Sequence, residues 1–180
     1  MKKVCTAAFL ALILMASTEV AAQEFSGIDK SPMDMASFPT NYQNADKVIR
    51  IIYSRPQLKG RSMNELAPQG EVWRTGANEA TEITFYKDVN FGGRDIKAGT
   101  YSLFTIPDQG EWTVALNKNL NQWGAYSYDE SADVARVKVP HNTDSKSLEE
   151  FSIAFKETDQ GADMVMGWDK TRVSVPITVK

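Results

Sequence analysis

Alternation of apolar and polar residues with a period of two most constrains the fold of this 180-residue chain. It recurs from Val48 to the C-terminus, and such alternation places one side of a β-strand in a core and the other side in water. No stretch keeps a helical period, although residues 62–66 fit one short turn. The pattern therefore predicts an all-β chain. Its clearest strands are expected at residues 48–54, 82–86, 112–117, 151–156 and 173–179, with others at 100–106, 134–139 and 164–168.

Small and polar residues separate these strands. Gly92–Gly93 predicts a tight hairpin, because glycine adopts positive φ without a Cβ penalty. Asp169–Lys170 is expected to close another hairpin. We predict a single antiparallel β-sandwich, of jelly-roll or immunoglobulin-like type, over residues 41–180, with a closed barrel as the second choice. Residues 23–40 are expected to form an extended leader.

The N-terminus has the three parts of a secretory signal peptide. Lys2 and Lys3 precede an apolar run at residues 7–15, and the small residues at 20–22 fit a cleavage site, so we expect cleavage after Ala22. The apolar run is shorter than the roughly 20 residues that span a bilayer. The mature chain is therefore expected to be periplasmic or extracellular, with no membrane attachment after cleavage.

Composition argues against several kinds of chemistry. Cys5 is the only cysteine and lies within the expected signal peptide, so the mature chain would have no thiol nucleophile. His141 is the only histidine and lies in a polar connection, which argues against a Ser-His-Asp triad and against zinc. The formal net charge of −3 argues against nucleic acid, which favours a basic surface. We expect no cofactor and no metal.

Two polar clusters carry the candidate binding residues: the first polar cluster at residues 53–61 and the second polar cluster at residues 73–81. Arginine presents a planar fork to a carboxylate or phosphate, tryptophan can stack on a sugar, and an amide both donates and accepts hydrogen bonds. These clusters therefore predict a site for a small polar or saccharide ligand. Its expected contacts are Arg55, Arg61, Trp73, Arg74, Asn78 and Glu79.

Other interpretations of these residues stay open. Arg74 could pair with Glu79 and tie the loop in place, because buried arginine is usually paired within the protein. A hydrolase that uses two carboxylates needs neither histidine nor cysteine. The chain could also be a structural or interaction domain of the cell envelope. The carboxylates near the clusters are Glu65, Glu71, Glu79 and Glu82.

The remaining aromatic residues divide into two groups. Trp112 and Trp168 stand at alternating strand positions and are expected in the core. Trp123, Tyr126 and Tyr128 lie in an apparent loop between strands. They could form an exposed stacking platform or cap one end of the sandwich.

The order of the motifs also resembles a known family. Read together, residues 53–61, 73–81, 99–107 and 111–114 are similar to the bacterial family called domain of unknown function 2911, and the resemblance runs from about Ser31 to Lys180. It implies a secreted or periplasmic β-rich domain. It implies no established activity and supplies no catalytic residues, so we expect an exported, non-catalytic domain.

Overall fold

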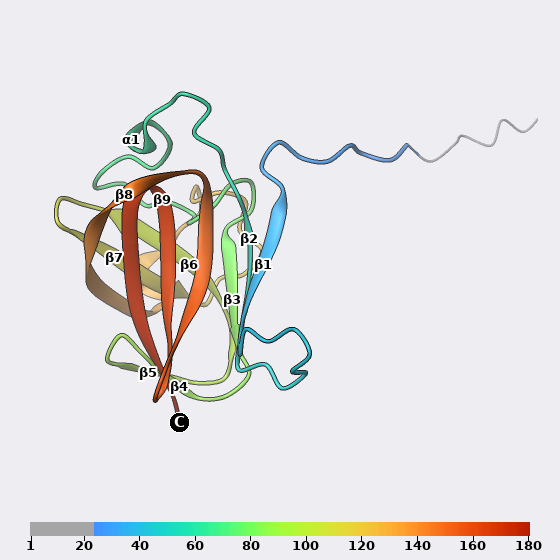
Figure 1. The fold of residues 1–180 in the computed structure, drawn as a ribbon, viewed down its shortest axis with the longest axis vertical. Coiled ribbons are helices and arrows are strands. Elements are labelled where there is room, and N and C mark those ends of the chain that lie inside the picture. Colours follow the sequence, from blue (N-terminus) through green and yellow to red (C-terminus); the bar gives the residue numbers. More distant parts are fainter. Residues whose placement is uncertain (1–23) are drawn as a thin grey trace, which may run out of the picture.

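The structure is a computed structural model that describes residues 24–180. Within that range the chain forms nine β-strands, one short α-helix and one 3-10 turn (Figure 1). Neighbouring strands pair antiparallel in the order β1-β2-β3-β6-β7-β8-β9-β4-β5, and the sheet is not closed into a barrel. The predicted all-β, sandwich-like fold is confirmed, whereas the second choice of a closed barrel is wrong. The strands are β1 (Met33–Phe38), β2 (Ile49–Ser54), β3 (Thr81–Phe85), β4 (Val89–Phe91), β5 (Arg94–Ile96), β6 (Gly99–Pro107), β7 (Glu111–Asn117), β8 (Asp133–Thr158) and β9 (Gly161–Val179).

The longest strand, β8, divides the sheet into two layers. Residues 133–140 of β8 pair with β7, whereas residues 141–158 pair with β9. The second pairing shifts register on both sides of Leu148, and such irregularities bend a strand. The first layer is therefore β1, β2, β3, β6, β7 and the start of β8. The second layer is the rest of β8 with β9, β4 and β5, and Figure 1 shows β8 and β9 in front of the first layer.

The core lies between the two layers. Phe85 of β3 meets Phe91 of β4 across the interface, with ring centroids 6.1 Å apart. Trp112 and Trp168 are 3% and 1% exposed, which confirms that they fill the core. Burial of such large rings is the main source of stability in a chain without disulfides. Other fully buried side chains include Ile49, Ile51, Ile83, Leu103, Leu116, Phe151, Met164 and Met166.

Two local predictions are confirmed. Gly92 and Gly93 form the two-residue turn between β4 and β5, with φ of 55° and 90°. One helical turn, α1 (Met63–Leu66), follows Ser62. The Ser62 side chain accepts a hydrogen bond from the Glu65 backbone N–H, and the Glu65 carboxylate accepts one from the Ser62 backbone N–H. This reciprocal pair satisfies donors that a helix start leaves free.

Two local expectations are wrong. Asp169–Lys170 does not close a hairpin, because β9 runs through both residues, and the turn between β8 and β9 lies at residues 159–160 instead. His141 lies within β8 rather than in a loop, and its Nε2 accepts a hydrogen bond from the Gly110 N–H. Part of the expected leader forms β1, which pairs with β2 over its whole length. Backbone hydrogen bonds with β9 can hold residues 141–143 in a strand even though their side chains are polar.

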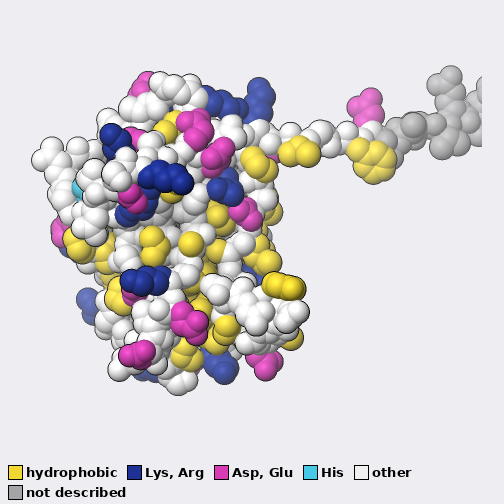
Figure 2. Space-filling model, viewed as in Figure 1, with side chains coloured by type: hydrophobic (Ala, Val, Ile, Leu, Met, Phe, Trp, Pro, Cys, Tyr) yellow, Lys and Arg dark blue, Asp and Glu magenta, His cyan; other side chains and the backbone are white. Residues whose placement is uncertain are grey.

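The predicted signal peptide, its cleavage after Ala22 and Cys5 lie outside the described residues. In residues 24–180, no helix is long and apolar enough to cross a membrane. Figure 2 shows acidic and basic side chains interspersed over the visible face of the folded body. The N-terminal segment extends away from that body, and its Phe25 and Ile28 are 89% and 93% exposed.

Candidate functional site

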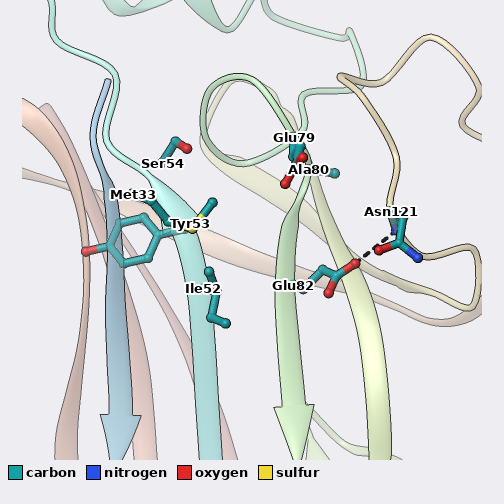
Figure 3. Close-up of a pocket in the computed structure, with 8 residues that line it drawn as sticks. All are labelled: Met33, Ile52, Tyr53, Ser54, Glu79, Ala80, Glu82 and Asn121. Atoms are coloured by element: carbon teal, nitrogen blue, oxygen red, sulfur yellow. Dashed lines mark hydrogen bonds between the residues drawn. The ribbon is translucent and has the colours of Figure 1, made fainter. Parts of the chain in front are cut away.

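A hollow opens on the outer side of the first layer, where β1, β2 and β3 meet two loops (Figure 3). It consists of two adjoining cavities of about 220 and 320 Å³, which share Met33, Ser54 and Glu79. We call the combined surface the Glu79 hollow. Its lining residues are Asp29, Ser31, Met33, Ile52, Tyr53, Ser54, Asn78, Glu79, Ala80, Glu82, Asn121 and Trp123.

Strand alternation supplies the floor of the Glu79 hollow. Ile51 and Ile83 point into the core and are fully buried, so their neighbours Ile52 and Glu82 point outward. Ile52 and Glu82 are also direct cross-strand partners on β2 and β3, and Figure 3 shows both beside the hollow. An apolar side chain and a carboxylate therefore lie next to each other on the outer face.

The second polar cluster is a tightly hydrogen-bonded loop beside this floor. Trp73 exchanges both backbone hydrogen bonds with Thr105 of β6, at 2.7 and 2.9 Å. Within the loop, the Thr81 hydroxyl donates to the carbonyl of Thr75 at 2.8 Å, and Thr75 has a φ of 54°. These bonds fix the backbone, so Glu79 emerges at a defined place on the rim.

Gly76 lets this loop pack directly on the end of β2. A Cβ at Gly76 would lie 3.0 Å from the Ser54 carbonyl oxygen and 3.1 Å from the Thr81 hydroxyl. Only glycine permits so close an approach of two backbone segments. Because Ser54 belongs to the first polar cluster, the two predicted clusters meet at the hollow, through Ser54 from one and Asn78 and Glu79 from the other.

A second loop carries Trp123 to the rim. Its backbone is bonded to the first loop on both sides of the indole. The Gln122 carbonyl accepts from the Ala80 N–H at 2.8 Å, before Trp123. The Gly124 N–H donates to the Asn78 carbonyl at 2.9 Å, after it. The two loops therefore form one connected rim.

Asn121 completes the connection, since its N–H donates to the Glu82 carboxylate at 2.9 Å (Figure 3). Asn121 and Gly124 have φ of 57° and 72°, which lets the chain turn tightly on either side of Trp123. Trp123 itself is 64% exposed. An exposed aromatic ring on a fixed backbone is available for stacking on a ligand.

Trp73, by contrast, is a core residue. It is 5% exposed, and its ring stacks on that of Trp168. The indole N–H donates to the Gly76 carbonyl at 3.1 Å, so its one polar atom is satisfied inside the protein. Trp73 pairs with Thr105 on the same edge of β6 that pairs with β3. Its side chain therefore points into the core between the two layers. Trp73 therefore presents no free ring face to a ligand.

The two arginines of the first polar cluster bond to the protein itself. Arg55 donates to the Phe151 carbonyl at 3.1 Å and to the Ser152 hydroxyl at 2.7 Å. It also forms an ion pair with Asp34 at 3.1 Å. Arg61 donates to two carbonyls of its own turn. Arg55 thus joins β2 to β1 and β8, and neither arginine lines the Glu79 hollow.

Arg74 and Glu79 do not form the ion pair that their sequence positions allow. Among the ion pairs of residues 24–180, none joins these two side chains. The Nε of Arg74 is buried without a hydrogen-bond partner, whereas Glu79 is exposed and lines both cavities. Thr75 and Asn78, both at positive φ, redirect the chain between them.

Asn78 connects the N-terminal segment to the hollow. Its side-chain amide donates to Asp29 at 3.1 Å, and Asp29 also accepts from the Ser31 N–H at 2.7 Å. The Ser31 bond first, and the Asn78 bond second, hold the pKa of Asp29 below its ordinary value. Asp29 is therefore an anion at neutral pH. In residues 24–180, no group of three or more His, Cys, Asp or Glu side chains is arranged to hold a metal ion.

The three aromatic residues of the second loop have different environments. Trp123 and Tyr126 are 64% and 85% exposed, as a stacking platform requires. Tyr128 instead packs edge-on against Phe104, with ring centroids 4.9 Å apart, in a small second core outside the first layer. Trp123 and Tyr126 therefore have the exposure of a stacking platform, whereas Tyr128 packs on the outer side of the first layer rather than at one end of the sandwich.

Several lining residues could not be recognised from the sequence. Met33 and Ile52 are 62% and 44% exposed. Their exposure depends on which strands lie next to β1 and β2, and the alternation of residues does not predict that arrangement. Asp29 lies in the expected leader and joins the site through Asn78. In the sequence, only the turn-forming residues Asn121 and Gly124 indicate that Trp123 lies in a tight loop.

A family model described as "Protein of unknown function (DUF2911)" matches residues 31–177. No curated protein matches the chain. No solved structure matches it either.

Proposed function

The chain belongs to this family of proteins of unknown function, and we propose that it is an exported, non-catalytic protein whose Glu79 hollow binds a small polar or saccharide ligand. The observation that carries the proposal is the meeting of both polar clusters and the exposed Trp123 at one concave surface. Small-molecule sites combine a largely apolar concave surface with a few polar groups that fix orientation.

The chemistry of the lining suits such a ligand. Trp123 offers a ring face for stacking on a sugar or another flat, weakly polar body. Ser54 and Asn78 can each both donate and accept a hydrogen bond, and the Glu79 carboxylate can accept from two hydroxyl groups. The two adjoining cavities, of about 220 and 320 Å³, are of the size that small-molecule pockets have.

The rigidity of the rim also supports binding. Backbone hydrogen bonds hold the residues on both sides of Trp123, and Gly76 packs the other loop onto β2. A site whose groups are already fixed loses little conformational entropy when a ligand arrives. A hollow between two mobile loops would lack this advantage.

A screen of glycans and small metabolites, read by the change in tryptophan fluorescence and by calorimetry, tests the proposal. Trp123→Ala should abolish binding of any hit, because it removes the stacking face. Tyr126→Ala is the matched control, since Tyr126 is an exposed aromatic of the same loop that does not line the hollow. Equal binding by the native protein and Trp123→Ala would contradict this assignment of the site.

Export is the second part of the proposal. Lys2 and Lys3, the apolar run at residues 7–15 and the small residues at 20–22 support it. Mass spectrometry of the cell-envelope and extracellular fractions should find a chain that begins at Gln23. A cytoplasmic chain that retains Met1 would contradict it.

Hydrolysis by two carboxylates is a second candidate, favoured by one observation: Glu79 and Glu82 line the same cavity. Such enzymes place an acid and a base or nucleophile on either side of the bond to be broken. Release of nitrophenol from a panel of nitrophenyl glycosides, lost in both Glu79→Gln and Glu82→Gln, would support this candidate. Binding without turnover would favour the non-catalytic function.

A further inference from the structure

The lining of the Glu79 hollow carries a net negative charge, although Lys30, which lines neither cavity, acts electrostatically on Asp29. Asp29, Glu79 and Glu82 line it, and no Lys, Arg or His lines either cavity. Ion pairs neutralise other carboxylates in residues 24–180, but none of those pairs involves these three.

Hydrogen bonds position two of the three carboxylates without adding positive charge. Asp29 accepts from the Asn78 amide, and Glu82 accepts from the Asn121 N–H. Within the described part of the chain, the Glu79 side chain is engaged in no hydrogen bond, although it lies where the two cavities join. Glu79 is therefore the carboxylate most available to a ligand.

Carboxylates on a convex surface are simply hydrated, but these three flank a concave and partly apolar surface. Trp123, Met33 and Ile52 are 64%, 62% and 44% exposed. Large apolar groups that stay exposed around a hollow favour a ligand with an apolar surface of its own. A cation is also attracted to the face of an indole ring. The carboxylates and the exposed apolar side chains are independent features, and both favour a cationic ligand with an apolar surface.

We propose that the natural ligand of the Glu79 hollow carries a positively charged amine on a small, partly apolar body, as an amino sugar or an alkylammonium compound does. This inference rests on the proposed function and specifies its ligand class. The ammonium group would lie against Glu79, and the body would lie across Trp123, Met33 and Ile52. An anionic ligand would meet three lining carboxylates and no lining cation, so like-charge repulsion disfavours it.

Two matched pairs of probes test the inference by calorimetry with the mature chain. Glucosamine is compared with N-acetylglucosamine, which is neutral, and choline with its neutral analogue 3,3-dimethylbutanol. The charged member of at least one pair should bind about tenfold or more tightly than its neutral partner. Its affinity should fall as salt is raised, because salt screens charges on an open surface. The pair that responds distinguishes an amino sugar from an alkylammonium ligand.

Glu79→Gln should remove most of this preference, because it neutralises the free carboxylate and keeps nearly the same shape. Glu157→Gln is the matched control: Glu157 is an exposed carboxylate at the β8–β9 hairpin and does not line the hollow. It should leave the affinity for the charged probe unchanged. Thermal denaturation of both variants verifies that they fold.

The outcomes separate this inference from the proposed function. If the neutral members bind as tightly as the charged ones and Trp123→Ala abolishes both, the hollow is a binding site but the preference for a cation is wrong. If neither charged probe binds at millimolar concentration, the inference is overturned, and the wider screen decides whether the hollow binds anything else. A preference for the charged probes that Glu79→Gln leaves intact also overturns it.

Discussion

The indole ring of Trp73 lies nearly parallel to that of Trp168, with ring centroids 5.4 Å apart and an interplanar angle of 16°. Both rings are buried, at 5% and 1% exposure. Trp73→Ala would leave a cavity against Trp168, so it should lower the free energy of unfolding by about 3–5 kcal/mol. Urea denaturation followed by circular dichroism measures the change.

Trp123→Ala is the control for that loss. Trp123 is 64% exposed, so its removal should change the free energy of unfolding by no more than about 0.5 kcal/mol. The two variants thus separate a tryptophan that holds the fold from one that is available to a ligand. A small effect for Trp73→Ala would contradict its place in the core.

Gly76→Ala should destabilise the protein and distort the hollow. The added methyl group would lie 3.0 Å from the Ser54 carbonyl oxygen, so the loop would have to move away from β2. We expect a loss of about 1–3 kcal/mol, the usual effect of overpacking. Gly27→Ala is the control, because nothing lies within 4 Å of the added atom there. Denaturation curves of the two variants should differ clearly, and coincident curves would contradict the close approach.

Arg55→Ala should lower the free energy of unfolding by about 1.5–3 kcal/mol, because it removes the Arg55 hydrogen bonds to Phe151 and Ser152 that join β2 to β8. The ion pair with Asp34 should contribute little, because both side chains are more than a third exposed, at 34% and 42%, and water screens the charges. In a double-mutant cycle with Asp34→Ala, the coupling energy should stay below about 1 kcal/mol. A larger coupling would show that the ion pair is the main contribution of Arg55.

Arg74→Ala and Glu79→Gln should have additive effects on stability, within about 0.5 kcal/mol. The reason is that the two side chains form no ion pair, and only Glu79 lines the hollow. A full double-mutant cycle by urea denaturation gives the coupling energy. Strong coupling would mean that the two side chains do pair in solution.

Tyr128 should make stability depend on pH in the alkaline range. Burial first, and the hydrogen bond to Asp133 second, raise the pKa of its phenol above the ordinary value of 10.0. The folded state therefore favours the protonated phenol. Its contribution to stability is complete below about pH 10 and is lost as pH rises through the raised pKa.

Tyr128→Phe should accordingly lose stability less steeply than the native protein above about pH 10. Thermal denaturation at a series of alkaline pH values measures the slope. The ultraviolet titration of tyrosinate should also lose its latest-ionising component in the variant. Identical slopes in the two proteins would contradict a role for this phenol.

Much of the fold could be predicted because alternation identifies strands whose two faces meet different surroundings. The β2 run from Ile49 to Tyr53 and the core position of Trp112 followed from it directly. The passage of β8 through residues 140–147 could not be predicted, because its polar and turn-forming residues are typical of a loop. Residues 141–143 stay extended because they pair with β9, and the alternation of apolar and polar residues does not predict that pairing.

The site was less predictable, because it depends on which strands and loops become neighbours. The sequence singled out Asn78 and Glu79, but Trp73, only five residues before Asn78, belongs to the core. Pairing with Thr105 decides the direction of the Trp73 ring, and that pairing joins segments far apart in the chain. The place of Trp123 beside Glu79 depends on backbone bonds between two loops and has no counterpart in a local pattern.

The longest strand has a consequence for how this protein can change. Because β8 runs from the first layer into the second, no boundary between modules separates the two layers along the chain. Neither layer can be produced alone, exchanged with that of another protein, or deleted from a gene without breaking the ladder of the remaining one. New properties are therefore expected to arise in the loops around the Glu79 hollow, where insertions leave the shared strand β8 intact.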